Sequence, residues 1–484
     1  MRKNNDIEEA FLLLEARKEE DREGLTWGVI GQETKMIGYI AGPMVAVTVA
    51  QYMLQVISIM MAGHLGELAL SSSAIAVSIA GVTGFSFLLG MACALETLCG
   101  QAYGAKQYNK LGNQTYTAIF CLVIVCIPIS ILWIFVDKIL IFFGQDPLIS
   151  QEAGKFILWL LPALFANSFL QPLVRYFQMQ SMIIPLVISS CVSICFHILV
   201  CWVLVFKSGL GNCGGALALG LSLWLNAIIL GSYMQFSSSC EKTRSKISME
   251  IFEGVGEFFR FAIPSAVMIC LEWWSYELIL LLSGLLPNPQ LETSVLSVCL
   301  NTIITLYAIP YGISAAVSTR VANELGAGNP KGAKMSIVAA MILILAEIIV
   351  VGTTLYSCRH VFGHVYSSDL EVVEYVTRMT PLLCVSIVID GLQSALSGIA
   401  RGCGWQHIGA YVNLAAFYLF GIPIAIMLSF WVNFRGQGLF IGILSGGLLQ
   451  TSMLAIITCC TNWDKQAIAA KERSSKEKSQ PIVT

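Results

Sequence analysis

Residues 36–61 read MIGYIAGPMVAVTVAQYMLQVISIMM, a run that contains no Asp, Glu, Lys or Arg. A helix needs about 20 residues to cross the hydrocarbon layer of a membrane. The run is longer than this, and it would bring no charged side chain into the lipid. It therefore predicts a transmembrane helix.

The whole chain has the same apolar character. Of its 484 residues, 56% are hydrophobic and only 12% are charged, which is about half the charged share of an average soluble domain. The mean hydropathy is +0.75. So few charges cannot cover a water-exposed surface of this size. The composition predicts a membrane protein, and it argues against nucleic-acid binding because the basic residues form no continuous stripe.

Twelve apolar runs are long enough to span a membrane as helices. The predicted spans are residues 36–61, 70–98, 115–136, 156–180, 183–206, 213–236, 260–285, 294–318, 335–357, 375–400, 408–432 and 437–460. The fold class is thus an all-α polytopic membrane protein. The first 35 residues lack the pattern of a cleaved signal peptide, so we expect the first span to direct insertion.

Lys and Arg favour the cytoplasmic side of a membrane. If the amino terminus is cytoplasmic, 22 of the 28 Lys and Arg residues lie inside and six lie outside. We therefore expect both termini in the cytoplasm. The predicted domains are a cytoplasmic tail (1–35), a first lobe of six helices (36–236), a cytoplasmic connector (237–259), a second lobe of six helices (260–460) and a cytoplasmic tail (461–484).

The two lobes are related by an internal repeat. At an offset of 221 residues, Pro43 aligns with Pro264, and at 222, Gly90 aligns with Gly312. Because each half has an even number of spans, both halves enter the membrane from the same side. Parallel repeats of this kind are found in secondary transporters, which rock two lobes about a site near the membrane midplane.

Four acids deep in the predicted spans stand out, because a charged acid at mid-bilayer costs about 2.5 to 3.5 kcal/mol and is usually functional, paired or protonated. They are Glu272, Glu277, Glu347 and Asp390. The repeat aligns Glu272 with Gln51 and Asp390 with Gln171, so the architecture does not need an acid at these positions in order to fold. We interpret Glu272 and Asp390 as functional, whereas Glu347 fits an interhelical hydrogen bond equally well.

Helical geometry separates the acids of the stretch LEWWSYE, residues 271–277. Glu272 and Tyr276 lie one turn apart on one face, whereas Glu277 is rotated by about 140° from Glu272. We expect one acid to face the interior of its lobe and the other to lean toward a cavity edge. Asn301 and Tyr307 of the next span are candidates to donate hydrogen bonds inside that lobe.

Burial disfavours the charged form of a carboxyl group, so a buried acid can bind and release protons near neutral pH. When it is deprotonated, the same group attracts a cation. Proton and cationic substrate can then compete for one site. The sequence therefore predicts proton-coupled transport rather than enzymatic catalysis.

The remaining reactive side chains favour structural roles. Most of the 16 cysteines lie in apolar spans, where a thiol packs as a small hydrophobe. No Cys/His cluster has the spacing of a zinc site, and we expect no metal and no cofactor. His197 is interpreted as a core residue without a convincing serine partner. Residues 8–13, EEAFLL, fit either an acidic dileucine sorting signal or a surface helix.

Five motifs together resemble the multidrug and toxic compound extrusion (MATE) family, and in particular its plant branch. They are GHLGELAL (63–70), ALETLCGQAYGA (94–105), PNPQLETSVLSVCLNT (287–302), STRVANELGAGNP (318–330) and GIARGCGWQ (398–406). The resemblance covers about residues 30–462. It implies twelve helices in two pseudo-symmetric six-helix lobes around a V-shaped cavity.

The resemblance also implies an activity, namely proton-driven antiport that exports organic cations, xenobiotics or plant secondary metabolites. In that family the carboxylates matching Glu272 and Asp390 take part in proton and substrate coupling, and Tyr276, Glu277, Asn301 and Tyr307 match polar neighbours. Some animal relatives carry a glutamate where this chain has Asn301. The expected partners are small organic solutes that are cationic or amphipathic, protons and the lipid bilayer, and we expect a monomer.

Two other functions remain as alternatives. A lipid-linked flippase of the same superfamily would require a cationic cavity, whereas the deep charges recognised in this sequence are acids. An intramembrane enzyme would require a nucleophile with a base, or two aspartates together. Localisation is expected to be the plasma membrane rather than the vacuolar membrane.

Overall fold

The structure is a computed structural model that describes residues 27–246, 248–365 and 369–475. This part of the chain is helical and contains no strand. Twelve of its helical segments are long and apolar enough to cross a membrane, which confirms the predicted fold class. The candidate sorting signal at residues 8–13 lies outside the described residues.

Six of the spanning segments form the first lobe. Its elements are α2 (Trp27–Gly63), α3 (Glu67–Ala80), the π-helix η1 (Gly81–Phe85), α4 (Ser86–Ala92), α5 (Ala94–Gly104), α6 (Tyr108–Ile134), α7 (Val136–Phe142), α8 (Pro147–Met179), α9 (Ile183–Phe206) and α10 (Asn212–Phe236). The segments from α3 to α5 form a single span, Glu67–Gly104.

The other six spanning segments form the second lobe. Its elements are α12 (Val255–Ser283), α13 (Pro289–Gly326), α14 (Pro330–Ser357), α15 (Arg359–Phe362), η3 (Gly363–Val365), α16 (Leu370–Cys403), α17 (Gln406–Asn413), η4 (Leu414–Gly421), α18 (Ile422–Ile426), η5 (Met427–Trp431) and α19 (Arg435–Cys460). The segments from α17 to η5 form one span, which contains two π-helical stretches.

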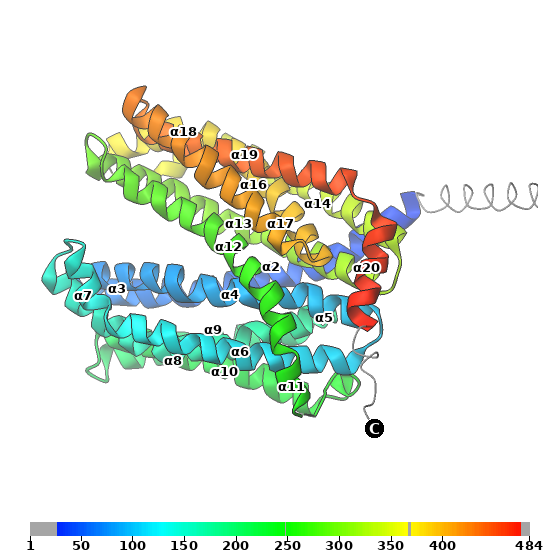
Figure 1. Cartoon of the computed structure of the whole chain (residues 1–484). Helices are drawn as coiled ribbons and strands as arrows, with labels where there is room; N and C mark the ends of the chain where they lie inside the picture. The colour runs from blue at the N-terminus through cyan, green and yellow to red at the C-terminus, as the bar shows by residue number, and fades with distance from the viewer. Residues whose placement is uncertain (1–26, 247, 366–368, 476–484) are drawn as a thin grey trace, which may run out of the picture.

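Three short elements lie outside the spans. The connector between the lobes contains η2 (Ser238–Cys240) and α11 (Glu250–Glu253), and α20 (Trp463–Ser475) follows the last span. Figure 1 shows the start of α2 and the whole of α20 at the same end of the molecule. We call this the terminal end, and we call the opposite end, where α7 lies, the distal end.

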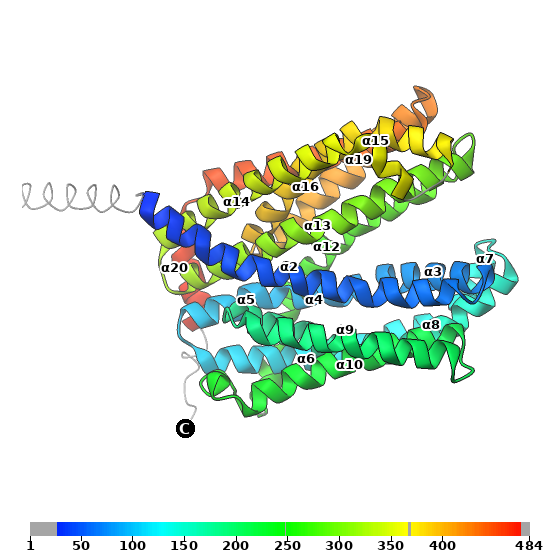
Figure 2. The same ribbon diagram turned by 180° about the vertical axis from the view of Figure 1, so that it is seen from behind.

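The two lobes approach each other at the terminal end and diverge toward the distal end (Figures 1 and 2). The first helix of each lobe crosses toward the other lobe. A Cβ atom at Gly90 of α4 would collide with Ala266 of α12, and one at Gly312 of α13 would collide with Val45 of α2. Gly90 and Gly312 are equivalent in the repeat, so the two crossings are equivalent contacts.

The same reciprocity holds at the terminal end. Gly104 packs against the backbone of Asn323, and Gly326 packs against the backbone of Gln101. An offset of 222 residues relates Gly104 to Gly326 and Gln101 to Asn323. Neither glycine leaves room for a Cβ atom. The lobes therefore close on each other through backbone contacts in which only glycine fits.

Helix α20 lies across this closed end. Its Arg473 donates a hydrogen bond to the carbonyl of Cys403 in the second lobe, and its backbone carbonyl accepts one from Lys110 in the first lobe. Trp463 packs on Trp405, with ring centroids 6.0 Å apart. Burial of the guanidinium lowers the pKa of Arg473 below its ordinary value. The helix thus contacts both lobes on the terminal side.

Candidate functional site

Asp390 of α16 lies inside the second lobe and is 6% exposed. One of its carboxylate oxygens accepts a 2.6 Å hydrogen bond from Ser386, one turn earlier on the same helix. The other accepts a 3.4 Å hydrogen bond from the hydroxyl of Tyr276 on α12. Tyr276 therefore connects the two helices that carry the predicted acids.

Glu272 lies one turn before Tyr276 on α12, as the helical spacing predicts. Its carboxylate faces the amide side chains of Gln393, Gln450 and Asn413 and lies within electrostatic range of Asp390. Gln450 in turn donates a 2.7 Å hydrogen bond to Asn413. We call Glu272, Tyr276 and Asp390 the carboxylate cluster.

Neither acid of the carboxylate cluster forms an ion pair with a described residue, although Arg401 lies within electrostatic range of Glu272. In the part of the chain that the structure describes, no Lys, Arg or His forms an ion pair with Glu272 or Asp390. The hydroxyls of Ser386 and Tyr276 donate hydrogen bonds to Asp390, and amide side chains lie near Glu272. A carboxyl group in such surroundings can be neutral without breaking an ion pair, which is the property that a proton-binding group needs.

Glu277 points away from the carboxylate cluster, as expected from its rotation on the helix. Its carboxylate accepts a 3.5 Å hydrogen bond from Ser78 of α3, which belongs to the first lobe. The indole of nearby Trp274 donates a 3.1 Å hydrogen bond to the carbonyl of Val82 in η1. Glu277 is therefore part of a contact between the lobes on the distal side of α12.

The predicted supporting residues differ in position. Tyr307 of α13 lies within electrostatic range of both cluster acids. The side chain of Asn301 is exposed and makes no hydrogen bond to any described residue, so its supporting role stays a prediction. Neighbouring Thr302 occupies the buried face instead. Glu347 of α14 lies near Asp390 and against Gly391, but its Oε2 accepts no hydrogen bond from the described residues.

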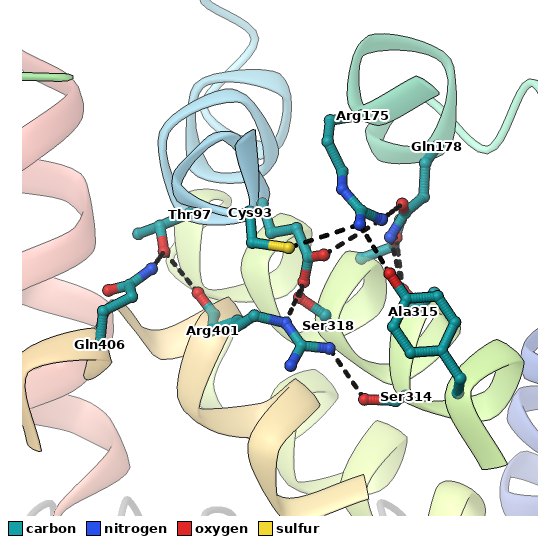
Figure 3. A network of polar contacts seen from close by, with 12 residues as sticks. Cys93, Thr97, Arg175, Gln178, Ser314, Ala315, Ser318, Arg401 and Gln406 are labelled. Atoms are coloured by element: carbon teal, nitrogen blue, oxygen red, sulfur yellow. Dashed lines mark hydrogen bonds and ion pairs between the residues drawn. The ribbon is translucent and has the colours of Figure 1, made fainter. Parts of the chain in front are cut away.

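A second buried acid, Glu96 of α5, lies between the lobes. Its side chain is fully buried and forms ion pairs with Arg175 of α8 at 3.2 Å and with Arg401 of α16 at 2.9 Å. Ser318 of α13 donates a further 2.5 Å hydrogen bond to it. Figure 3 shows how Arg175 and Arg401 approach from different lobes. We call Glu96, Arg175 and Arg401 the interlobe cluster.

Neutral hydrogen bonds between the lobes surround the interlobe cluster. Thr97 donates to the carbonyl of Arg401 and accepts a 2.6 Å hydrogen bond from Gln406 (Figure 3). Gln178 donates a 3.0 Å hydrogen bond to the carbonyl of Ala315. Closer to the surface, Glu33 of α2 binds Arg320 of α13 through two hydrogen bonds of 2.8 and 3.1 Å.

These contacts overturn the expectation that the deep charges are all acids. The deep charges are not only acids, because Arg175 is 1% exposed and Arg401 is 5% exposed. Nor are buried acids confined to the second lobe, since Glu96 belongs to the first. The repeat places Ser318 opposite Glu96, and Ser318 is the residue that donates a hydrogen bond to it.

His197 is a core residue, but it does have serine partners, contrary to expectation. Its Nε2 lies 3.2 Å from the hydroxyl of Ser58, and its Nδ1 lies 2.9 Å from that of Ser222. The imidazole is fully buried inside the first lobe. Both hydroxyls also donate to backbone carbonyls, those of Gly215 and Ala218. The arrangement satisfies buried polar groups and gives no support for a catalytic nucleophile.

Sequence reasoning missed the amides that face Glu272 and all three members of the interlobe cluster. Asn413 and Gln450 are amide side chains in apolar spans, and polar residues inside a membrane tend to mark a site. They could have been found by that signal. Within the described residues, no group of three His, Cys, Asp or Glu side chains is arranged to hold a metal ion.

The fold and the two clusters define a polytopic membrane protein built from two parallel, pseudo-symmetric lobes, as in secondary transporters. A family model for MATE proteins (MatE) matches the chain twice, at residues 43–203 and 264–427. The two matches begin at the paired prolines of the repeat. The chain belongs to the MATE family of transporters.

Similar plant proteins cover nearly the whole chain. Protein DETOXIFICATION 12 of Arabidopsis thaliana is 59% identical over 456 residues, which are 93% of this chain and 95% of that protein. Protein DETOXIFICATION 14 of the same plant is 62% identical over 442 residues, 91% of each chain. The crystal structure of the eukaryotic MATE transporter AtDTX14 superposes with a TM-score of 0.89 at 61% identity, covering 92% of this chain and 99% of that one.

Proposed function

We propose that this transporter exports small organic solutes from the cytoplasm in exchange for protons. The carboxylate cluster carries the proposal, because it places two acids and a tyrosine inside one lobe without an ion pair to any described basic residue. Protonation neutralises the acids, and deprotonation creates a negative site that attracts a cation. The proposed substrates are organic cations or amphipathic compounds, including xenobiotics and plant secondary metabolites.

Competition between proton and substrate would make the exchange obligatory. A proton gradient contributes about 1.4 kcal/mol per pH unit for each proton, and a membrane potential contributes about 2.3 kcal/mol per charge for each 100 mV. One proton per cycle can therefore drive roughly tenfold accumulation at a gradient of one pH unit. The driving force comes from the gradient, so the proposal requires no cofactor.

Alternating access is proposed from the interlobe cluster. The terminal end is closed by Glu96 and its two arginines, by the glycine contacts and by the bond between Glu33 and Arg320. The lobes diverge on the distal side (Figure 1). If the terminal end faces the cytoplasm, as the charge distribution predicts, this arrangement is closed to the cytoplasm. Opening to the cytoplasm then requires Glu96 and Arg401 to separate.

The cellular setting is part of the proposal. We infer that both termini are cytoplasmic, that the protein acts as a monomer and that it works in the plasma membrane. Export across the plasma membrane and uptake into a vacuole both move solute away from the cytoplasm. In the plasma membrane and in the vacuolar membrane alike, the same face of the protein would lie toward the cytoplasm.

The decisive experiment uses purified protein in liposomes with an imposed pH gradient and a fluorescent organic cation. Wild-type protein should move the cation against its gradient, and Glu272→Gln or Asp390→Asn should reduce this flux by at least tenfold. Glu152→Gln, which removes a partly exposed acid on α8 that pairs with Lys155, is the matched control. Full gradient-driven flux in both cluster variants would refute proton coupling by these residues.

A lipid-linked flippase gains no support from the buried arginines. Recognition of a pyrophosphate needs cations that are free to bind it, whereas Arg175 and Arg401 both pair with Glu96. The carboxylate cluster carries the opposite charge. The arrangement therefore favours cationic over anionic substrates.

A further inference from the structure

The outer face of the first lobe contains an apolar groove with a volume of about 900 Å³. It lies between α6, α8 and α10, and the connector around α11 closes one end of it. Phe169 and Trp224 pack together in it, with ring centroids 5.3 Å apart. Phe120 of α6 and Phe252 of α11 pack edge to face at 5.0 Å on another side. The groove is separate from both buried charge clusters.

The position of the groove indicates that lipid surrounds it. Its walls α6 and α10 are spanning helices, and the connector lies at their terminal ends (Figure 1). Ile228 on α10 is 58% exposed and Met249 beside α11 is 79% exposed. An exposed apolar side chain on a spanning helix, such as Ile228, faces lipid, and an exposed apolar residue in the adjoining connector, such as Met249, is typical of a segment in the membrane interface.

The mouth of the groove is polar and carries a cation. Gln235 donates a 2.8 Å hydrogen bond to the hydroxyl of Tyr116, and the guanidinium of Arg244 donates to the carbonyl of Gln235. Arg244 forms no ion pair with any described carboxylate and is partly exposed. Two residues further on, Lys246 is exposed as well. Positive charge therefore lies next to the apolar groove, in the connector that follows the spanning helix α10.

This combination matches the chemistry of a phospholipid. An acyl chain can fill an apolar groove, and burial of each CH2 group contributes about 0.8 kcal/mol. A guanidinium suits a phosphate because its N–H groups can donate two parallel hydrogen bonds. A neutral or cationic organic solute could fill the groove, but it would have no anionic group to bind Arg244 at the mouth. Charge complementarity thus favours an anionic phospholipid.

We propose that this groove is a binding site for an anionic phospholipid of the leaflet at the terminal end. One acyl chain occupies the groove between Phe169, Trp224 and Phe252, and the phosphate is bound by Arg244. Because α11 continues directly into α12, which carries Glu272, a lipid bound here holds the base of the helix that carries the carboxylate cluster. The proposal does not depend on proton coupling.

The test compares lipid retention by native mass spectrometry after reconstitution in vesicles of phosphatidylcholine and phosphatidylglycerol. Gly231→Leu extends a side chain into the groove, where a Cβ would meet only Leu173 at 3.9 Å. Arg244→Gln removes the charge. Gly352→Leu on α14, where a Cβ has nothing within 4 Å, and Arg378→Gln at an exposed ion pair are the matched controls.

We expect wild type and both controls to retain phosphatidylglycerol. Gly231→Leu should lose retention of both lipids, and Arg244→Gln should lose the preference for phosphatidylglycerol by at least threefold. Melting curves identify any variant that fails to fold, and Ala227→Leu then replaces Gly231→Leu as the groove-filling variant. Unchanged retention in the groove variant overturns the proposal, as does a wild type that retains an organic solute but no phospholipid.

Discussion

The two buried acid clusters differ in what surrounds them. Glu96 lies between two arginines that come from different lobes. Glu272 and Asp390 lie among hydroxyls and amides of one lobe. A carboxylate held by two cations remains ionised, because protonation would leave buried positive charge without a partner. A carboxylate is therefore suited to holding the two lobes together in the interlobe cluster and to binding and releasing protons in the carboxylate cluster.

The largest expected effect is at the interlobe cluster. Arg401→Ala removes the buried ion pair between the lobes at the terminal end, and breaking a buried pair typically costs about 3–5 kcal/mol. Thermal unfolding of the purified protein should show a large loss of stability. Arg378→Ala, which breaks an exposed pair with Glu374, should change stability by less than about 1 kcal/mol. If Arg401→Ala melts like wild type, the interlobe cluster does not stabilise the contact between the lobes, and its proposed difference from the carboxylate cluster is lost.

The second effect is a difference in pH dependence. If protons compete with a cation at the carboxylate cluster, acidification neutralises the acids and weakens cation binding, by up to about tenfold per pH unit for one proton. Binding should recover as the pH rises. Glu272→Gln should flatten this dependence, as measured by equilibrium binding of a radiolabelled cation. Cation binding that is independent of pH in the wild type would argue that the cluster does not exchange protons.

Glu33 offers an intermediate case. Its bond to Arg320 also joins the lobes, but both side chains are partly exposed, at 13% and 15%. Water compensates a broken pair at such a position, so Glu33→Gln should cost about 1 kcal/mol or less. Its melting curve should lie between those of wild type and Arg401→Ala. A loss of thermal stability as large as that of Arg401→Ala would show that burial does not decide how much an ion pair between the lobes stabilises the protein.

The smallest effect is expected at Glu277. It contacts Ser78 across the lobes at 3.5 Å and has no contact with the carboxylate cluster. Glu277→Gln keeps a hydrogen-bond acceptor there, so gradient-driven flux should fall by less than about twofold, since one neutral hydrogen bond contributes only modestly. Flux in liposomes measures this directly. A loss equal to that of Glu272→Gln would place Glu277 in the coupling site.

Much of the fold could be predicted, because a span is identified by its own length and composition. The deep positions of Glu272 and Asp390 were predictable for the same reason, since an acid is conspicuous in an apolar run. Asn301 shows what the sequence pattern leaves undecided. Only packing decides whether Asn301 or the adjacent Thr302 faces the lobe interior, and a helix of 38 residues such as α13 allows several faces.

The interlobe cluster was not predictable by the same means. Arg175 and Arg401 lie near the ends of their spans, where a basic residue is interpreted as a loop charge that sets orientation. Glu96 lies near the end of its span as well. The pairing of Glu96 with Arg401 joins residues 305 positions apart, and no local pattern contains that information.

The reciprocal glycine contacts have a consequence for the origin of the chain. Gly104 meets Asn323 in the same way that Gly326 meets Gln101, so the lobes meet as two subunits of a symmetric dimer do, with each patch facing its own equivalent. A chain with only six spans could have used this surface to pair with a second copy of itself. Gene duplication and fusion would then have preserved an existing interface, and substitutions in one copy alone, such as the acids at 272 and 390, would have made the two halves different.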